Sequence, residues 1–267
     1  MTETSFFDAE TAITAAGPGR WSTFLGADWN INLNPNGGYA QAPLLRAMGA
    51  EVGAHPDPAS ATTHFLRPAV AGCEADITVE VLRTGRRTST VRGTMAQQGK
   101  VRLESIATFA DHGTSVSTEW ELGIPAPPIP SPDECLDRST IVQDVELPLM
   151  SRVEVRFDPA STGSDDGGVA VVNGWMRFRD ERPADSLALT LMADCFPPSV
   201  FSVFGRVGWV PTIELTVHVR RRPAPGWIQA RFVTADSYGA TLVEDGVLWD
   251  ETGAVVAQAR QLALIAN

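Results

Sequence analysis

The second half of this chain repeats the first, and the repeat limits the folds that the chain can adopt. His64 in the string TTHFLRP and His218 in TVHVRRRP lie 154 residues apart, since 218 − 64 = 154. Gly99 in the turn QGKVRLE and Gly253 in TGAVVAQ are separated by the same 154 residues. Two separate anchors agree on one offset. The 267 residues are therefore expected to form two similar units, each large enough for a core of its own.

Each copy shows one helical segment next to a run of strands. In the first copy a helix is expected at residues 40–50, after the turn NPNGGY, and strands are expected at 62–66, 75–82, 88–97 and 101–110. In the second copy a helix is expected at 185–196, and strands are expected at 169–179, 210–221, 227–237, 239–249 and 254–265. Val, Ile and Thr enrichment, with glycine turns between the runs, indicates antiparallel meanders. The pattern predicts an α+β protein.

The string GIPAPPIPSPD at residues 123–133 is too rich in proline to form a regular helix and is typical of a linker. We predict an N-terminal domain at 1–122, a proline-rich linker and crossover at 123–150, and a C-terminal domain at 151–267. Each sheet has an apolar face to bury, and the simplest cover is its own helix. The expected architecture is two tandem antiparallel sheets, each wrapped around a helix.

Composition excludes several classes of function. A net charge of −11 argues against nonspecific nucleic-acid binding, which needs an excess of Lys and Arg. No segment approaches the roughly 18 consecutive apolar residues of a membrane span. The N-terminal string MTETSFFD lacks the basic region of a signal peptide, which predicts a cytoplasmic protein. Cys73, Cys135 and Cys195 are too few and too far apart for a disulfide framework or a metal site, so we expect no metal.

Several strings in a fixed order carry a family resemblance. The first copy has NGGY at 36–39, HFLRP at 64–68, VLRTGRR at 81–87 and ESIATFA at 104–110. The second copy has LMAD at 191–194, PTIELTVHVRR at 211–221 and VAQARQ at 256–261. This series resembles the double hotdog fold of acyl-CoA thioesterase II and its thioesterase-like relatives, over nearly the whole chain. The resemblance implies an enzyme that hydrolyses acyl-CoA to free acid and CoA without a cofactor.

The resemblance also implies a catalytic set made of an aspartate on the second helix, a Thr or Ser on the next strand and a glutamine on the final strand. These positions hold Asp194, Thr212 and Gln261. Our hypothesis is that Asp194 takes a proton from a water held by Thr212 and Gln261, with no covalent intermediate. Asp194 lies in the apolar stretch LTLMADCF, where a raised pKa is expected. Thr216 is the rival of Thr212, since it shares the same strand face.

The repeat predicts that these polar groups belong to one copy only. Subtracting 154 from their positions gives Ala40, Pro58 and Ala107. None of these three residues can act as a base or position a water with its side chain. The chemistry is therefore expected in the second copy.

Gly37, Gly38 and Tyr39 are predicted to bind substrate. Two glycines at a helix start can present amides to the thioester oxygen, reinforced by the helix dipole. The alternative is that they only make a tight turn. Tyr39 stands where the family often has Gln, which bears on the acyl or CoA preference.

Two other functions stay open. A hotdog hydratase or dehydratase needs a His with an acid at the active helix, and no such motif occurs near either helix. A non-catalytic acyl-CoA or acyl-carrier binding protein would keep the fold but not the hydrolysis. His64 and His218 are symmetric and interpreted as structural, and Cys195 as a buried inert thiol. Exposed sheet edges also favour a homodimer of the doubled unit.

Overall fold

The computed structural model describes residues 4–114, 122–141, 145–161, 168–206 and 208–266. The α-helices are α1 Phe6–Glu10, α2 Gly37–Val52, α3 Ser186–Met192 and α4 Phe201–Phe204, and short 3-10 helices occur at His112–Thr114, Pro132–Glu134, Arg138–Thr140 and Pro148–Ser151. The strands of the first copy are β1 Thr14–Gly17, β2 Arg20–Leu25, β3 Asn30–Ile31, β4 Asn34–Pro35, β5 Asp57–Phe65, β6 Cys73–Thr84, β7 Ser89–Gln97 and β8 Lys100–Ala110. The strands of the linker and second copy are β9 Leu136–Asp137, β10 Val153–Phe157, β11 Ala170–Phe178, β12 Thr212–Val219, β13 Ile228–Tyr238, β14 Thr241–Trp249 and β15 Val255–Leu264.

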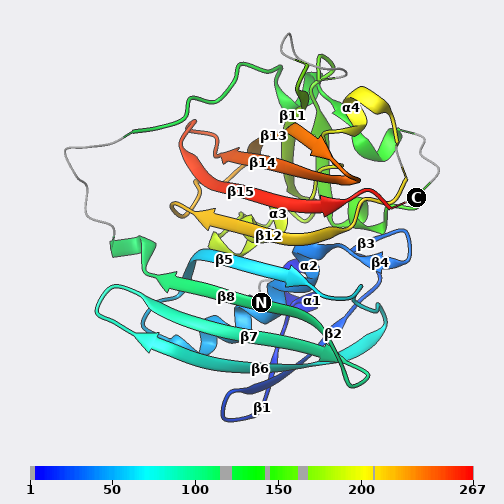
Figure 1. Cartoon of the computed structure of the whole chain (residues 1–267). Coiled ribbons are helices and arrows are strands. Elements are labelled where there is room, and N and C mark those ends of the chain that lie inside the picture. Colours follow the sequence, from blue (N-terminus) through cyan, green and yellow to red (C-terminus); the bar gives the residue numbers. More distant parts are fainter. Residues whose placement is uncertain (1–3, 115–121, 142–144, 162–167, 207, 267) are drawn as a thin grey trace.

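Within the described ranges, thirteen strands form one antiparallel sheet in the order β1-β2-β6-β7-β8-β5-β12-β15-β14-β13-β11-β10-β9 (Figure 1). Strand β5 of the first copy pairs with β12 of the second, so the two halves join edge to edge. A mostly antiparallel sheet with few helices was predicted and is confirmed, but the prediction of two separate sheets is wrong. Either half alone would leave the backbone of an edge strand unpaired, and pairing β5 with β12 satisfies both.

The junction of β5 and β12 lies on a local two-fold axis of the repeat. Thr62 lies directly opposite Thr216, its own equivalent 154 residues later, and their hydroxyl oxygens are 2.9 Å apart. Gly99 and Gly253, the second anchor of the repeat, both have positive φ, at 70° and 79°. Glycine adopts this conformation without steric cost. The offset of 154 therefore holds at the junction of β5 and β12 and at these two glycines.

The helices do not follow this offset. Asn36 caps α2 and Asp185 caps α3, so the helix starts differ by 185 − 36 = 149. Asp194 lies nine residues after its cap, as Leu45 does in the first copy, since 194 − 185 = 45 − 36 = 9. The predicted match of Asp194 with Ala40 is therefore wrong, although Leu45 is also apolar and buried. The longer segment between α3 and β12 restores the offset in the strands.

Helix α3 is shorter than predicted. It ends at Met192 instead of residue 196, and Ala193 and Asp194 form a turn. Pro197 and Pro198 follow, and proline cannot continue a helix because it lacks an amide hydrogen and its ring clashes with the preceding turn. Asp194 therefore projects from a turn just beyond a helix.

Helices α2 and α3 meet on one face of the sheet. Helix α2 packs against β2 and β5 to β8, whereas α3 lies on β5 and β12 at the junction of the halves (Figure 1). The predicted separate wrapping of each helix by its own sheet is not found. Gln41 on α2 donates to the Thr190 carbonyl on α3 at 3.0 Å, which ties the helices together. This contact brings the start of α2 against the end of α3.

The linker runs along the second half and is held there by side-chain donors. Trp249 Nε1 donates to the Ile124 carbonyl at 2.7 Å, and Trp175 Nε1 donates to the Pro130 carbonyl at 2.9 Å. Beyond the prolines, β9 pairs with β10. The domain limits themselves stay a prediction. Within the described part of the chain, no helix has the length and apolar content that crossing a membrane requires.

Candidate active site

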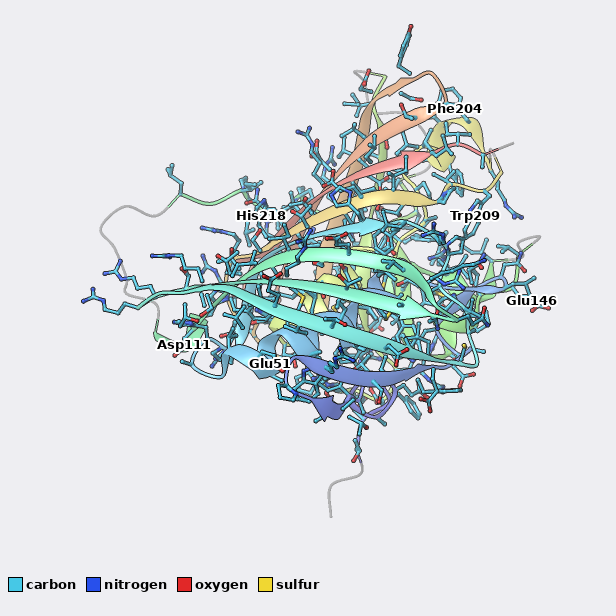
Figure 2. All side chains as sticks on the ribbon, turned by 60° about the horizontal axis from the view of Figure 1, so that its bottom comes forward. Glu51, Asp111, Glu146, Phe204, Trp209 and His218 are labelled. Atoms are coloured by element: carbon cyan, nitrogen blue, oxygen red, sulfur yellow. The ribbon has the colours of Figure 1, made fainter. Side chains whose placement is uncertain are left out.

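A cavity of about 620 Å³ lies where β12 begins, and both copies and the linker contribute to its wall. Trp209 lines the cavity, as do Val145 and Leu147 on either side of Glu146. Figure 2 shows Trp209 and Glu146 on the same side of the molecule, opposite Asp111. The three residues predicted to act in catalysis, Asp194, Thr212 and Gln261, all line this cavity.

The carboxylate of Asp194 is held at the N-terminus of α2. The Gly38 amide donates to Asp194 Oδ2 at 2.9 Å, and Asn36 Nδ2 donates to the same oxygen at 2.9 Å. Asn36 Nδ2 also donates to the Asp194 carbonyl at 2.8 Å, while Asn36 Oδ1 accepts from the Tyr39 amide and caps the helix. A helix N-terminus favours an anion because its free amides and its dipole both stabilise negative charge. The first copy therefore positions the acid of the second.

Glycine at position 38 permits this close approach. A Cβ atom on Gly38 would lie 2.6 Å from the Leu191 carbonyl oxygen and 3.0 Å from Asp194 Cβ. A Cβ on Gly37 would lie 3.0 Å from Asp194 Oδ2 and 3.0 Å from the ring of Phe65. The paired glycines thus let α2 meet the turn that carries Asp194.

The pKa of Asp194 is raised to about 6, because burial of its carboxylate outweighs the hydrogen bonds from Gly38, Asn36 and Gly37 that lower it. No ion pair to Asp194 occurs among the described residues. A carboxylate near this value is largely ionised at neutral pH, yet it remains basic enough to accept a proton. The raised pKa expected from the apolar stretch is therefore found.

Thr212 and Gln261 share one face of the sheet. Thr212 lies opposite Ala263 on β15, and Ala263 is two residues from Gln261, so the side chains of Gln261 and Ala263 point to the same side. Thr216, the rival of Thr212, bonds instead to Thr62 at 2.9 Å and does not line the cavity. Among the described residues, no direct hydrogen bond joins Asp194 to either partner, and the cavity lies between the three.

Strand register confirms two of the three predicted correspondences between the copies. Ala107 lies opposite Ala61, just as Gln261 lies opposite Leu215, and 215 − 61 = 154. The other pair, Pro58 and Thr212, precedes a break in register at the same place in each copy. These two positions are thus polar in the second copy and apolar in the first.

Glu244 is an acid in the cavity wall that the sequence reasoning missed. It lies opposite Gln261 on the neighbouring strand and is 7% exposed. Its carboxylate accepts from the Ser199 amide at 2.6 Å. Burial raises the pKa of Glu244 to about 7, with the charge of Asp194 adding to the rise. Its inward position on β14 follows from alternation, so pairing β14 with β15 in the correct register would have found it.

Tyr39 and Gly38, which were predicted to bind substrate, contact other parts of the protein instead. Tyr39 is fully buried, stacks on Trp29 with ring centroids 5.1 Å apart, and its hydroxyl donates to the Glu10 carbonyl. It does not line the cavity, so we assign it to the core. Because the Gly38 amide is bonded to Asp194, the structure gives no support to its predicted role as an oxyanion donor. Gly37 lines the cavity next to Asp194.

The opposite end of the β5 and β12 pair holds a different arrangement. There Asp57, at the start of β5, accepts from Ser186 Oγ of α3 at 2.7 Å and forms an ion pair with Arg222 at 2.8 Å. Burial would raise the pKa of Asp57, but the hydrogen bonds from Arg222, His112 and Ser186 hold it below its ordinary value. The charge of Asp57 is thus neutralised by Arg222, whereas Asp194 forms no ion pair among the described residues.

The cavity wall contains neither of the histidines that anchor the repeat, His64 and His218, nor Cys195, which follows Asp194. His64 and His218 are exposed and do not line it. Cys195 is fully buried, and burial raises the pKa of its thiol far above the ordinary value. The burial expected for Cys195 is confirmed, whereas the structural role of the two histidines stays a prediction. Among the described residues, no group of three or more His, Cys, Asp or Glu side chains is placed to hold a metal ion.

Comparison with known proteins adds to this geometry. One solved structure matches the full chain: a candidate thioesterase II from Thermobifida fusca YX is 30% identical, covers 100% of both chains and gives a TM-score of 0.87. A protein with a hot dog fold from Alicyclobacillus acidocaldarius is 25% identical, covers 99% of both chains and gives a TM-score of 0.83. An uncharacterized protein of Mycobacterium tuberculosis is 36% identical over 100 residues, which are 38% of this chain. The match spans about a third (34%) of the length of that curated relative.

Two family profiles match the chain in tandem. The acyl-CoA thioesterase N-terminal domain matches residues 25–110. The acyl-CoA thioesterase C-terminal domain matches residues 132–265, which include Asp194, Thr212 and Gln261. The second match alone spans half of the chain. The chain therefore belongs to the acyl-CoA thioesterase family.

Proposed function

We propose that this protein hydrolyses acyl-CoA thioesters to a free acid and CoA, with Asp194 as the general base. The observation that carries the proposal is a carboxylate with a raised pKa that forms no ion pair with any described residue, in the wall of a cavity that Thr212 and Gln261 also line. Family membership and the full-length likeness to a candidate thioesterase II support the same reaction. The binding of acyl-CoA and the roles of the individual residues are part of this proposal.

The reaction needs only a water molecule and one base. Gly38 and Asn36 hold Asp194 Oδ2, so the other carboxylate oxygen is left to accept a proton from water in the cavity. The Thr212 hydroxyl and the Gln261 amide hold that water in line with the thioester carbonyl carbon. As the water oxygen attacks, the proton passes to Asp194. The carbon–sulfur bond then breaks, and the thiolate takes the proton back from Asp194.

In this scheme the glycine pair positions the base instead of polarising the carbonyl. The amide of Gly38 points at Asp194, and the absent side chains allow the turn to approach. A mobile or solvated carboxylate would be a poorer base, because its geometry would not be fixed before the water arrives.

The alternatives predict different measurements. Release of free thiol from a panel of acyl-CoAs, detected with a chromogenic disulfide, tests hydrolysis directly. A non-catalytic acyl-CoA or acyl-carrier binding protein would bind these thioesters and release nothing. A hydratase or dehydratase would change the absorbance of an enoyl-CoA, and no histidine among the described residues lines the cavity to support it.

Thr212→Val and Gln261→Ala test the two water-holding roles. We expect each to lower kcat by on the order of 10²-fold or more, since general-base catalysis contributes about 10²–10⁴-fold. Asp245→Asn is a suitable control, because Asp245 is an exposed acid paired with Arg260. The homodimer and the cytoplasmic location remain predictions, which light scattering and cell fractionation would test.

A further inference from the structure

Arg138 is a buried cation in the wall of the cavity, and the proposed hydrolysis does not use it. It comes from the linker, follows β9 and is 4% exposed. This residue lines the same cavity as Asp194. Sequence reasoning overlooked it because it lies in a segment without a repeat partner or a motif.

The contacts of Arg138 leave its charge uncompensated. Its Nη1 donates to the Cys195 carbonyl at 2.7 Å, and the guanidinium carbon lies 5.9 Å from the centroid of the Phe157 ring. Its Nε is buried and has no hydrogen-bond partner in the part of the chain that the structure describes. Among the described residues no carboxylate forms an ion pair with it, whereas the half-buried Arg152 and Arg182 each pair with two.

Such a group is costly to keep in a folded protein. Burial lowers the pKa of Arg138 to about 10, so the guanidinium remains charged at neutral pH. A buried charge without a counter-charge is unfavourable, and one carbonyl and one aromatic ring offset only part of that cost. The planar guanidinium with free N–H donors is the side chain best suited to bind a carboxylate.

The position of Arg138 selects between two sources of negative charge. Phosphates of CoA need contact with solvent, and two exposed arginines at this cavity, Arg67 and Arg206, suit them. Arg138 is enclosed, and the cavity wall contributed by the same linker contains the apolar side chains of Ile141 and Leu147. An apolar wall with one enclosed cation fits a short carbon chain that ends in an acid.

We propose that Arg138 binds a carboxylate at the far end of the acyl chain, so that the preferred substrates are CoA thioesters of dicarboxylic acids. This inference rests on the proposed hydrolysis of acyl-CoA. It names a class of acyl group, whereas the hydrolysis itself requires only a thioester.

The test compares glutaryl-CoA with pentanoyl-CoA, which have five acyl carbons each and differ in the terminal acid. In the unmodified protein kcat/KM should be at least about tenfold higher for glutaryl-CoA, as expected for a hydrogen bond to a charged group. Arg138→Met should bring the ratio close to one while pentanoyl-CoA is still hydrolysed, and Arg138→Lys should keep part of the preference. A ratio of one or less in the unmodified protein, or a ratio that Arg138→Met leaves intact, would overturn the proposal.

Arg102→Met is a matched control. Arg102 is 9% exposed, donates to the Pro68 carbonyl at 3.1 Å and also has a buried Nε without a partner, but it lies outside the cavity. Its replacement should leave the glutaryl to pentanoyl ratio unchanged. A loss of preference in Arg102→Met equal to that in Arg138→Met would mean a general structural effect, and would contradict the assignment.

A binding measurement separates this inference from the proposed function. The thermal midpoint of Asp194→Asn is recorded with glutaryl-CoA and with pentanoyl-CoA. A larger rise with glutaryl-CoA supports the Arg138 site even if no thioester is hydrolysed by the unmodified protein. Equal rises, together with hydrolysis of pentanoyl-CoA, would leave the thioesterase standing and refute the carboxylate site. The comparison needs no Arg138 variant and therefore does not depend on whether that variant folds.

Discussion

Replacing Asp194 by Asn should stabilise the folded protein at neutral pH while it removes the base. The folded state raises the pKa of Asp194 from 3.8 to about 6. Between these values the folded state keeps a proton that the unfolded chain has released, so stability falls as the pH rises through this window. A rise of about two pKa units corresponds to about 3 kcal/mol. The carboxylate faces a cavity that solvent can enter, so we expect a gain of about 1–3 kcal/mol.

Urea unfolding of both proteins at several pH values measures this difference. The two should have nearly equal stability at pH 4, where Asp194 is protonated in the folded state, and Asp194→Asn should become progressively more stable up to about pH 7. Asparagine can still accept the hydrogen bonds from Gly38 and Asn36 through its carbonyl oxygen. A variant that is less stable than the unmodified protein at pH 7 would refute the claim that burial disfavours the charged form of Asp194.

Three further changes test the surroundings of the base. Asn36→Ala removes the hydrogen bond of 2.9 Å to Asp194, and a hydrogen bond to a charged group is worth about 1.5 kcal/mol or more. The pKa that the acid limb of the kcat/KM profile reports should therefore rise by about one unit, and an unchanged pKa would contradict this. Gly38→Ala places a Cβ 2.6 Å from the Leu191 oxygen, so it should cost about 1–3 kcal/mol in urea unfolding and lower kcat, and unchanged stability would count against the close approach. Glu244→Gln should increase the free energy of unfolding when this is measured above pH 7, because burial raises the pKa of Glu244 to about 7 and disfavours its charged form. Equal stability of the two proteins at pH 8 would refute this expectation.

The repeat was the most informative part of the sequence because the strands that carry the site, β12 and β15, keep one offset of 154 from β5 and β8. The offset of 154 predicted the equivalence of Thr62 with Thr216, and those residues meet on the local axis. It failed at Asp194, since the segment between helix and strand differs in length and only the helix caps reveal the change. A single constant offset does not detect insertions or deletions in the loops between the copies.

The parts of the site that the sequence did not predict depend on contacts between distant segments. Asn36 and Asp194 are 158 residues apart, and their hydrogen bond forms only because α2 meets the turn after α3. Arg138 enters the cavity from a linker whose path is set by side chains of the second half. The single sheet likewise depends on β5 choosing β12 as its partner. Local propensity and alternation carry no information on such pairings.

Asp194 is proposed to activate the water that hydrolyses an acyl-CoA thioester. The most direct measurement is free-thiol release from a panel of neutral and carboxylated acyl-CoAs by the unmodified protein and by Asp194→Asn, with folding of both checked by their unfolding curves. We expect steady release by the unmodified protein and a loss of at least about 10²-fold in kcat for the folded variant. Undiminished release by folded Asp194→Asn would contradict the role of Asp194 as the base.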